Sequence, residues 1–222
     1  MPLAGKPMIL QIIDRLNTCL SLQETIVATT LSSHDDPLCT VLERAGIRYY
    51  RGSESDVLQR FAEAAHLSKA ELIVRITGDC PLIHPQLIDD TVNEYVKTPY
   101  DYLYPNSASG VIRGLDVEVF SREALEKANR IARKEEYREH VTACMYNEPD
   151  HFHGGVYIAD KRLRTPKYRL CVDEETDYLL IKCLYEELYQ EGKIIDIYEV
   201  LHYLQQNPEI ASLNAEVRQR TV

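Results

Sequence analysis

Two aspartates stand directly after segments that read as buried strands, and their carboxylates could hold a divalent cation. Asp79 follows ELIVRITG, and Asp173 follows YRLCV. In open α/β sheets ligands bind beyond the carboxyl ends of the strands, so both side chains can project into one crevice. A cation that neutralises a triphosphate needs one or two hard oxygen ligands of this kind, which favours Mg²⁺ and disfavours Zn²⁺. Structural roles remain open, because Gly-Asp-x-Pro forms a turn unaided and Asp173–Thr176 resembles a helix N-cap.

Three further side chains could meet a polar substrate. The segment Leu115–Phe120 (LDVEVF) alternates, which places Asp116 and Glu118 on one face of a strand. An exposed sheet face would give the same alternation without any function. His140 could donate a hydrogen bond to a phosphate or a carboxylate, although a single histidine on a helix is more often a surface or packing residue.

Other polar patterns are less specific. Arg113 and Gly114 are consistent with a loop that approaches a ligand. His151 and His153 face the same way on a predicted strand, but no third ligand stands near them in the sequence, which disfavours a metal site. The run Lys161–Arg169 holds five basic residues and is best explained as a solvated loop. The sequence contains no Walker loop, no G-x-G-x-x-G and no G-x-S-x-G.

The elements that must position these residues alternate along the first half of the chain. Apolar spacing, caps and breakers predict helices over 9–20, 35–45, 55–66 and 86–96, with Ser53 or Ser55 as the cap of the third, and strands over 24–30, 47–50 and 71–77. The second half is mixed, with strands near 101–104 and 116–120, extended pieces over 152–158 and 168–172, and helices from 121, from 135, over 178–188 and over 197–206. Such alternation predicts an α/β fold with parallel strands and helical crossovers.

The composition is that of an ordinary globular protein. The 222 residues, 45% apolar and 27% charged, fit one domain over 1–222 with a C-terminal helical extension from about 196. A net charge of -10 disfavours a nucleic-acid partner, because phosphate contact needs a basic surface. No apolar run approaches the roughly 20 residues of a membrane span, and charges near the N-terminus disfavour a signal peptide, so we expect a cytoplasmic protein with no membrane partner. Its six cysteines contain no Cys-x-x-Cys pair and are expected to be reduced.

The order of several segments resembles one protein family. The segments are PLAGKPMI, IVATT, DDPL, RGSESDVLQRF, VRITGDCPLI, GLDVEVF, REHVT and LCVDEETD. Together they resemble the spore coat polysaccharide biosynthesis protein F family, which are cytidylyltransferase-like proteins related to the acylneuraminate and Kdo cytidylyltransferases. The resemblance runs from Leu3 to about Leu188. It implies a three-layer nucleotide-diphospho-sugar transferase fold, in which helices flank a mixed, mainly parallel sheet.

The resemblance also implies a reaction. It is the Mg²⁺-dependent transfer of CMP from CTP to a sugar or sugar acid with release of pyrophosphate, for a surface polysaccharide such as that of a spore coat. Asp79 and Asp173 match the family's metal-binding pair. The residues that the resemblance places at the substrate are Arg75, Asp116, Glu118 and His140. Such chemistry rests mainly on positioning and charge neutralisation. A homodimer is typical of the relatives.

The start of the sequence departs from the family pattern. Family members begin with an apolar strand and a basic nucleotide-binding loop before the segment that matches Pro2–Ile9. We therefore expect the strands over 24–30 and 71–77 to flank an open position in the sheet. Unpaired backbone groups cost about 1 to 3 kcal/mol each, against the roughly 5 to 15 kcal/mol that holds a domain folded. We expect the chain as written to be less stable than one extended upstream by about 20 residues.

Two alternatives to a cytidylyltransferase remain open. One is a catalytically silent family member that binds a sugar nucleotide or a partner enzyme, which the missing loop would favour. The other is a glycosyltransferase on the same fold, because a metal-binding carboxylate pair serves both reactions and a fold does not fix a function.

Overall fold

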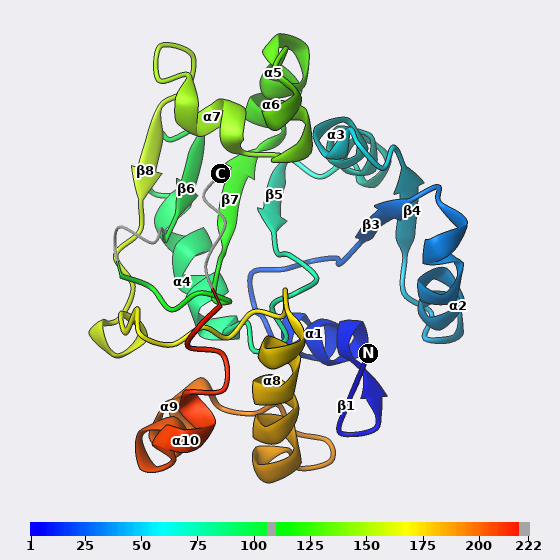
Figure 1. Ribbon diagram of the computed structural model, residues 1–222. Helices are drawn as coiled ribbons and strands as arrows, with labels where there is room; N and C mark the ends of the chain where they lie inside the picture. Colours follow the sequence, from blue (N-terminus) through cyan, green and yellow to red (C-terminus); the bar gives the residue numbers. More distant parts are fainter. Residues whose placement is uncertain (106–109, 218–222) are drawn as a thin grey trace.

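The computed structural model has the alternating strands and helices that the sequence predicts (Figure 1). It describes residues 1–105 and 110–217. The strands are β1 (Pro2–Leu3), β2 (Lys6–Pro7), β3 (Val27–Thr30), β4 (Tyr49–Gly52), β5 (Leu72–Arg75), β6 (Tyr102–Tyr104), β7 (Glu118–Ser121) and β8 (Gly154–Val156). The α-helices are α1 (Met8–Leu16), α2 (Asp36–Arg44), α3 (Val57–Ser68), α4 (Pro85–Tyr95), α5 (Arg122–Ile131), α6 (Glu135–Glu139), α7 (Ala143–Asn147), α8 (Glu175–Leu188), α9 (Ile197–Gln206) and α10 (Pro208–Ala211). Short 3₁₀ helices span Ser33–Asp35 and Lys161–Leu163.

Helix ends coincide with capping residues. Pro37 lies in the first turn of α2, and Gly46, just past its end, has a φ of +68°, which glycine adopts without strain. The prediction that Ser53 or Ser55 caps α3 is wrong. Asp56 is the cap, and its carboxylate accepts a hydrogen bond from a backbone N–H of the first turn at 2.9 Å. Ser53 instead accepts a hydrogen bond from the backbone N–H of that aspartate.

The strands form a mixed sheet of four and two separate pairs. The four-stranded sheet has the order β5-β7-β6-β8, with β7 antiparallel to both of its neighbours and β6 parallel to β8. Strands β3 and β4 pair in parallel, and β1 pairs with β2 as a hairpin. Two expectations need correction. Asp116 lies ahead of β7, which begins at Glu118. The segment 168–172 is not a strand, although Arg169 within it forms an isolated β-bridge to Arg113.

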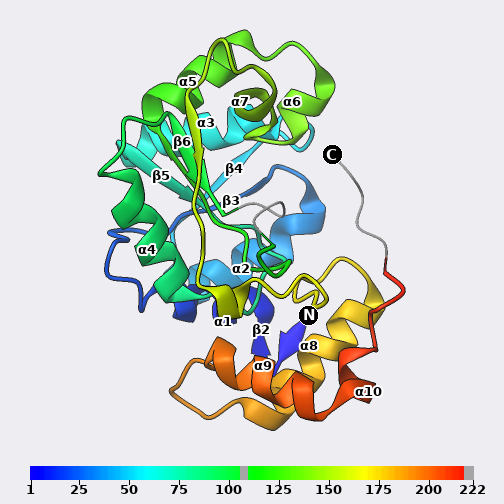
Figure 2. The ribbon, with the colours of Figure 1, turned by 90° about the vertical axis from the view of Figure 1, so that its left-hand side faces the viewer.

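Helices flank the sheets and divide the core in two. Helix α4 packs against β6 and β7, whereas α3 packs against β3 and β4 on one side and against α5 and α6 on the other. Neighbouring residues of β7 point to opposite faces, so Val119 enters the core shared with α4 and α8, and Phe120 enters the core shared with α3 and α5. Helices α8 to α10 lie at the end of the molecule opposite to α5 to α7 in both views (Figures 1 and 2). No helix in the described ranges is long and apolar enough to cross a membrane.

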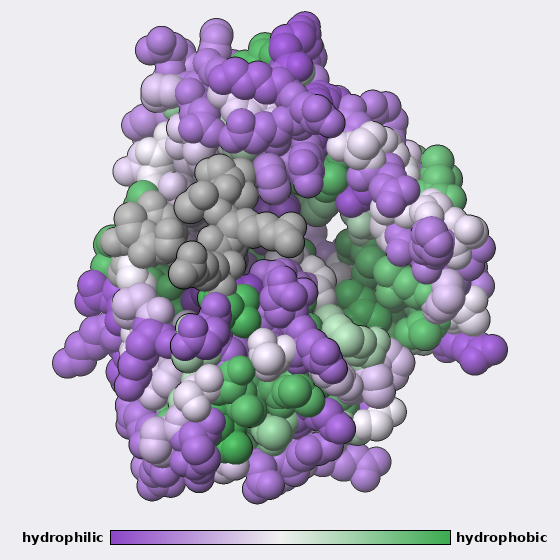
Figure 3. Space-filling model, viewed as in Figure 1, coloured by the Kyte–Doolittle hydropathy of each residue, from purple (hydrophilic) through white to green (hydrophobic). Residues whose placement is uncertain are grey.

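A groove separates β3 from β5. Among the residues that the structure describes, no strand ladder joins these two strands. A cavity of about 1310 Å³ lies between them and is lined by both strands and by α1, α2 and α3. Figure 3 shows this side of the molecule hollowed, with hydrophobic residues around the opening. The expected open position between the two strands is therefore confirmed, and the effect of an upstream extension on stability stays a prediction.

The groove should leave a signature in amide hydrogen exchange. Arg122 N donates to Glu71 O (2.9 Å), so by antiparallel alternation the N–H of Val74 points away from β7 and into the groove. Val119, its direct partner on β7, points its N–H toward β6. We expect Val74 to exchange about a hundredfold faster than Val119 or more, as measured by NMR in D₂O. Equal protection of the two amides would mean that another segment pairs with β5 in solution.

Candidate active site

The two aspartates predicted from the sequence lie side by side. Ligand atoms of Asp79, Cys171 and Asp173 all lie within 4.8 Å of one another. Asp79 belongs to the loop after β5, and its backbone oxygen accepts a hydrogen bond from Val172 N at 2.8 Å, which holds the two segments together. The expected convergence of the two carboxylates is thus confirmed. Their role as metal ligands stays a prediction.

Two buried thiols flank these carboxylates. Cys171 Sγ donates to Asp173 at 3.8 Å, and Cys80 Sγ donates to Asp79 at 3.5 Å. Burial raises the pKa of Cys171 to about 12 and also raises the pKa of Cys80 well above its ordinary value, so both thiols are protonated at neutral pH. The anionic donors of the cluster are carboxylate oxygens. This donor set fits a hard divalent cation such as Mg²⁺ better than it fits Zn²⁺.

A glycine lets a third segment approach the carboxylates. Gly114 has a φ of +97°, and a Cβ built on it would lie 2.4 Å from the carbonyl carbon of Leu170. Next to it, Arg113 O accepts a hydrogen bond from Leu170 N at 2.7 Å. No other residue type would permit this close approach without moving one backbone segment. The contact brings Asp116 next to the loop that carries Asp173.

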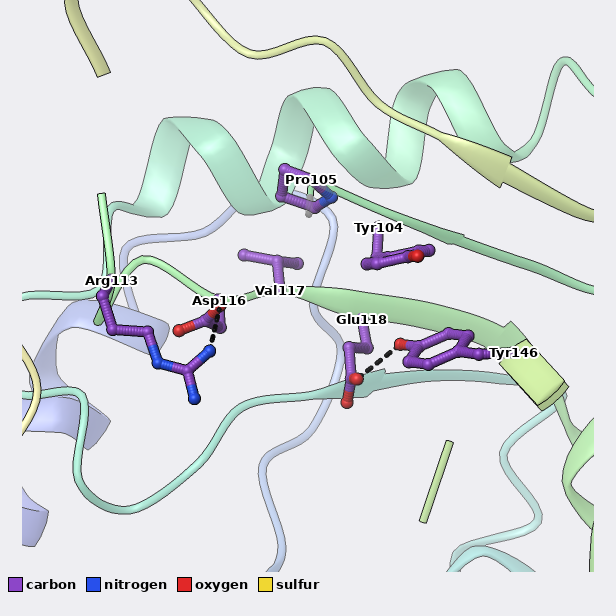
Figure 4. A pocket seen from close by; sticks show the side chains of 7 residues that line it. All are labelled: Tyr104, Pro105, Arg113, Asp116, Val117, Glu118 and Tyr146. Carbon is purple, nitrogen blue, oxygen red and sulfur yellow. Dashed lines mark hydrogen bonds and ion pairs between the residues drawn. The ribbon is translucent and has the colours of Figure 1, made fainter. Parts of the chain in front are cut away.

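The approaching segment lines a small pocket. Its volume is about 150 Å³, and its lining residues are Tyr104, Pro105, Arg113, Asp116, Val117, Glu118 and Tyr146 (Figure 4). The rings of Tyr104 and Tyr146 stack with centroids 4.5 Å apart. Arg113 pairs with Asp116 at 3.5 Å. The pocket therefore offers an aromatic wall, one exposed guanidinium and two carboxylates.

Glu118 is ionised although its side chain is only 15% exposed. Its carboxylate pairs with Arg75 and accepts hydrogen bonds from Thr142 Oγ1 (2.6 Å) and from the Tyr146 hydroxyl. Burial alone would raise the pKa of Glu118, but the Arg75 charge and the two hydrogen bonds outweigh it and lower the pKa below its ordinary value. All these partners hold the carboxylate in place, so Glu118 forms a rigid floor of the pocket.

Asp116 has the opposite electrostatic environment. Burial raises its pKa, and the nearby Glu118 and Asp79 charges act in the same direction. Arg113 and the backbone N–H of Gly114 (3.1 Å) oppose this shift without cancelling it. Asp116 is thus the carboxyl group of the pocket that gains a proton most readily.

The structure gathers most of the residues predicted from the sequence. Asp79 and Asp173 form the carboxylate cluster, Asp116 and Glu118 line the pocket, and Arg75 lies behind Glu118 at the edge of the groove. His140 does not belong to the pocket lining: it ends α6, and its backbone bonds to the turns on either side.

Sequence reasoning missed several residues around this site, four of which contact the pocket or Asp173 directly. These four are Tyr104, Tyr146, Thr142 and Arg169. Arg169 lies in the basic run that the sequence predicts to be a solvated loop, yet its guanidinium pairs with Asp173. The spacing of four residues between this arginine and Asp173 was a usable signal. The spacing of the two tyrosines and the threonine in the sequence gives no such signal, because their contacts depend on the packing of α7 over the sheet.

Comparison with known proteins agrees with this architecture. The cytidylyltransferase family model matches residues 1–215. An uncharacterized protein of Methanocaldococcus jannaschii, MJ1063, is 37% identical over 220 residues, which cover 98% of this chain and 88% of the relative. The spore coat polysaccharide biosynthesis protein SpsF of Bacillus subtilis is 34% identical over 188 residues, or 84% of this chain and 77% of the relative.

Solved structures show the same fold. A cytidylyltransferase from Leptospira borgpetersenii superposes with a TM-score of 0.86 at 26% identity, covering 100% of this chain and 91% of that one. A CMP-2-keto-3-deoxy-manno-octonic acid synthetase complexed with CTP superposes with a TM-score of 0.60 at 14% identity, over 84% of this chain and 90% of that one. The architecture is that of the nucleotide-diphospho-sugar transferases. The chain belongs to the cytidylyltransferase family.

The buried ion pair of Glu118 predicts a pH-dependent contribution to stability. We expect Glu118→Gln to lower the free energy of unfolding at neutral pH by about 3 kcal/mol, because it leaves the Arg75 guanidinium without its counter-charge. The folded-state pKa of Glu118 lies below its ordinary 4.5, so the stabilisation is present above about pH 4.5 and is lost as the pH falls through the folded-state pKa. Urea unfolding at neutral pH and near pH 3 measures the difference.

The matched control is Glu139→Gln, at an exposed glutamate on α6. This variant should unfold like the wild type at both pH values. A Glu118→Gln deficit of the same size at both pH values would contradict the ionised state of the buried carboxylate.

Proposed function

We propose that the protein transfers CMP from CTP to a sugar or sugar acid and releases pyrophosphate, with Mg²⁺ bound by Asp79 and Asp173. The proposal rests on one observation. Two carboxylates from separate segments lie within 4.8 Å of each other, beside a polar pocket, in a chain of the cytidylyltransferase family. A divalent cation bound there would neutralise the charge of a triphosphate.

The pocket beside the cluster has the features of an acceptor site. Its volume of about 150 Å³ suits a single sugar ring. Glu118, fixed by Arg75, Thr142 and Tyr146, can accept hydrogen bonds from acceptor hydroxyls, and the stacked tyrosine rings can cover an apolar ring face. The Arg113 side chain is 42% exposed, which leaves its guanidinium able to meet an acceptor carboxylate.

These residues act by positioning. In the proposed reaction an acceptor oxygen bonds to the α-phosphorus of CTP while the bond to the pyrophosphate oxygen breaks. The pocket orients the acceptor hydroxyl. Of the two carboxyl groups in the pocket, Asp116 is better suited to accept the proton of this hydroxyl, because burial raises the pKa of Asp116. The similarity to SpsF, a spore coat polysaccharide biosynthesis protein, supports a role in surface polysaccharide synthesis such as that of a spore coat. The proposal includes a cytoplasmic location and a homodimer, as expected from the sequence.

The test is pyrophosphate release from CTP in the presence of Mg²⁺ and a panel of sugar acids that includes 3-deoxy-manno-octulosonate. We expect Asp79→Ala to lower the rate by about a hundredfold or more, because it removes a metal ligand. The side chain lies on a half-buried loop, so its removal should cost the fold little stability. Asp150→Ala, at an exposed aspartate, is the control and should keep the wild-type rate.

Thermal unfolding of both variants confirms that they are folded. An Asp79→Ala protein with the wild-type rate at saturating Mg²⁺ would overturn the proposed metal site. CTP binding without turnover on any sugar acid would instead favour the silent family member.

A further inference from the structure

A buried aspartate stands behind the proposed metal site. Asp177, in the first turn of α8, has 0% exposure. Its Oδ2 accepts hydrogen bonds from the backbone N–H groups of Asp173 (3.1 Å) and Glu174 (3.0 Å). Its Oδ1 accepts a hydrogen bond from Arg169 Nε at 3.0 Å. One side chain therefore fixes the backbone of Asp173 and also one edge of the arginine.

That arginine reaches the carboxylate of Asp173 from the other side. Arg169 pairs with Asp173 through its terminal nitrogen while its Nε stays on Asp177. Its side chain is only 12% exposed, whereas that of Asp173 is 46% exposed. The exposed carboxylate is thus held at two points, through its backbone N–H by Asp177 and through its oxygen by Arg169.

The last link comes from the C-terminal segment. Asn214, in the turn that follows α10, is 5% exposed, and its Nδ2 donates to Asp177 Oδ1 (2.7 Å) and to Arg169 O (3.0 Å). Both neighbours are acceptors, so the orientation of this amide is fixed. The asparagine lies 37 residues beyond Asp177 in the sequence, which makes this contact a tertiary one.

We infer that Asn214 is a positioning residue for the metal site: it orients Asp177 and Arg169, and these hold Asp173 in the geometry that binds a divalent cation. The inference rests on the proposed function, since it takes Asp173 as a metal ligand. Residues that hydrogen-bond to a metal ligand, and not to the metal itself, fix the direction of the ligand's lone pairs. Their loss commonly weakens metal binding by about 10- to 100-fold. The C-terminal segment that carries Asn214 would then be part of the site and not an appendage to it.

Mn²⁺ affinity of the full chain tests the inference, measured by EPR of the free aquo ion. We expect Asn214→Ala to raise the Kd for Mn²⁺ about tenfold. Asn214→Ser keeps one hydrogen-bond donor and should give a smaller rise in the Kd for Mn²⁺. It replaces the alanine variant in the test if the alanine variant does not fold. Asn214→Asp has the shape of the native residue but sets a negative charge against Asp177, so it should weaken binding at least as much as the alanine.

Asn207→Ala is the matched control. Asn207 also donates its side-chain amide in the C-terminal segment, but to the backbone oxygen of Tyr203 within its own helix end (2.8 Å). It should keep the wild-type Kd even if its melting temperature falls. Asn214 variants that melt earlier yet bind Mn²⁺ like the wild type would show a structural role only and overturn the inference.

A variant of Asp173 distinguishes a failure of the inference about Asn214 from a failure of the proposed function. Asp173→Asn should lose Mn²⁺ binding. If it binds Mn²⁺ as the wild type does, or if the wild type binds none, the proposed metal site is wrong and the inference falls with it. If Asp173→Asn loses binding while Asn214→Ala and Asn214→Asp keep it, only the inference is overturned.

Discussion

A backbone hydrogen bond joins the two segments that carry the carboxylates of the candidate site. Val172 N donates to Asp79 O at 2.8 Å, and this bond sets the loop after β5 against the segment that leads into α8. Each segment brings one carboxylate, and neither could form a cation site alone. Gly114 adds the third segment by packing its backbone directly on Leu170. The carboxylate cluster and the adjoining pocket are thus consequences of backbone contacts, to which the side chains add the chemistry.

Buried charges stabilise this arrangement because each has several partners. Glu118 and Asp177 are both enclosed carboxylates, and each combines one arginine with hydrogen bonds from other donors. An unpaired charge in such a position would be neutralised or would unfold the site, so the arginines are required by the carboxylates. Asp116 lacks comparable compensation, and burial raises its pKa. Two carboxyl groups two residues apart therefore differ in their readiness to take a proton.

The sequence predicted the features of the fold and of the site that depend on residues close together in the chain. Apolar spacing and caps located the long helices, and α9 has its predicted bounds. The position of Asp79 and Asp173 after apolar segments was enough to expect their convergence. Strand ends were less accurate, since β4 begins two residues later than predicted. Asn214 could not have been found, because its contact with Asp177 depends on how the C-terminal helices fold back, which no local pattern encodes.

The groove between β3 and β5 also bears on how the molecule unfolds. With no ladder across it in the described ranges, helix α3 is the element that packs both on the β3–β4 pair and on α5 and α6 of the larger body. Cooperativity between two regions grows with the contacts that they share. The β3–β4 pair with α2 can then behave as a separate folding unit that packs on the larger body mainly through this helix. Loss of structure there need not disturb the carboxylate cluster, because Val172, Arg169 and Asp177, which bond to Asp79 and Asp173, lie on the other side of the groove.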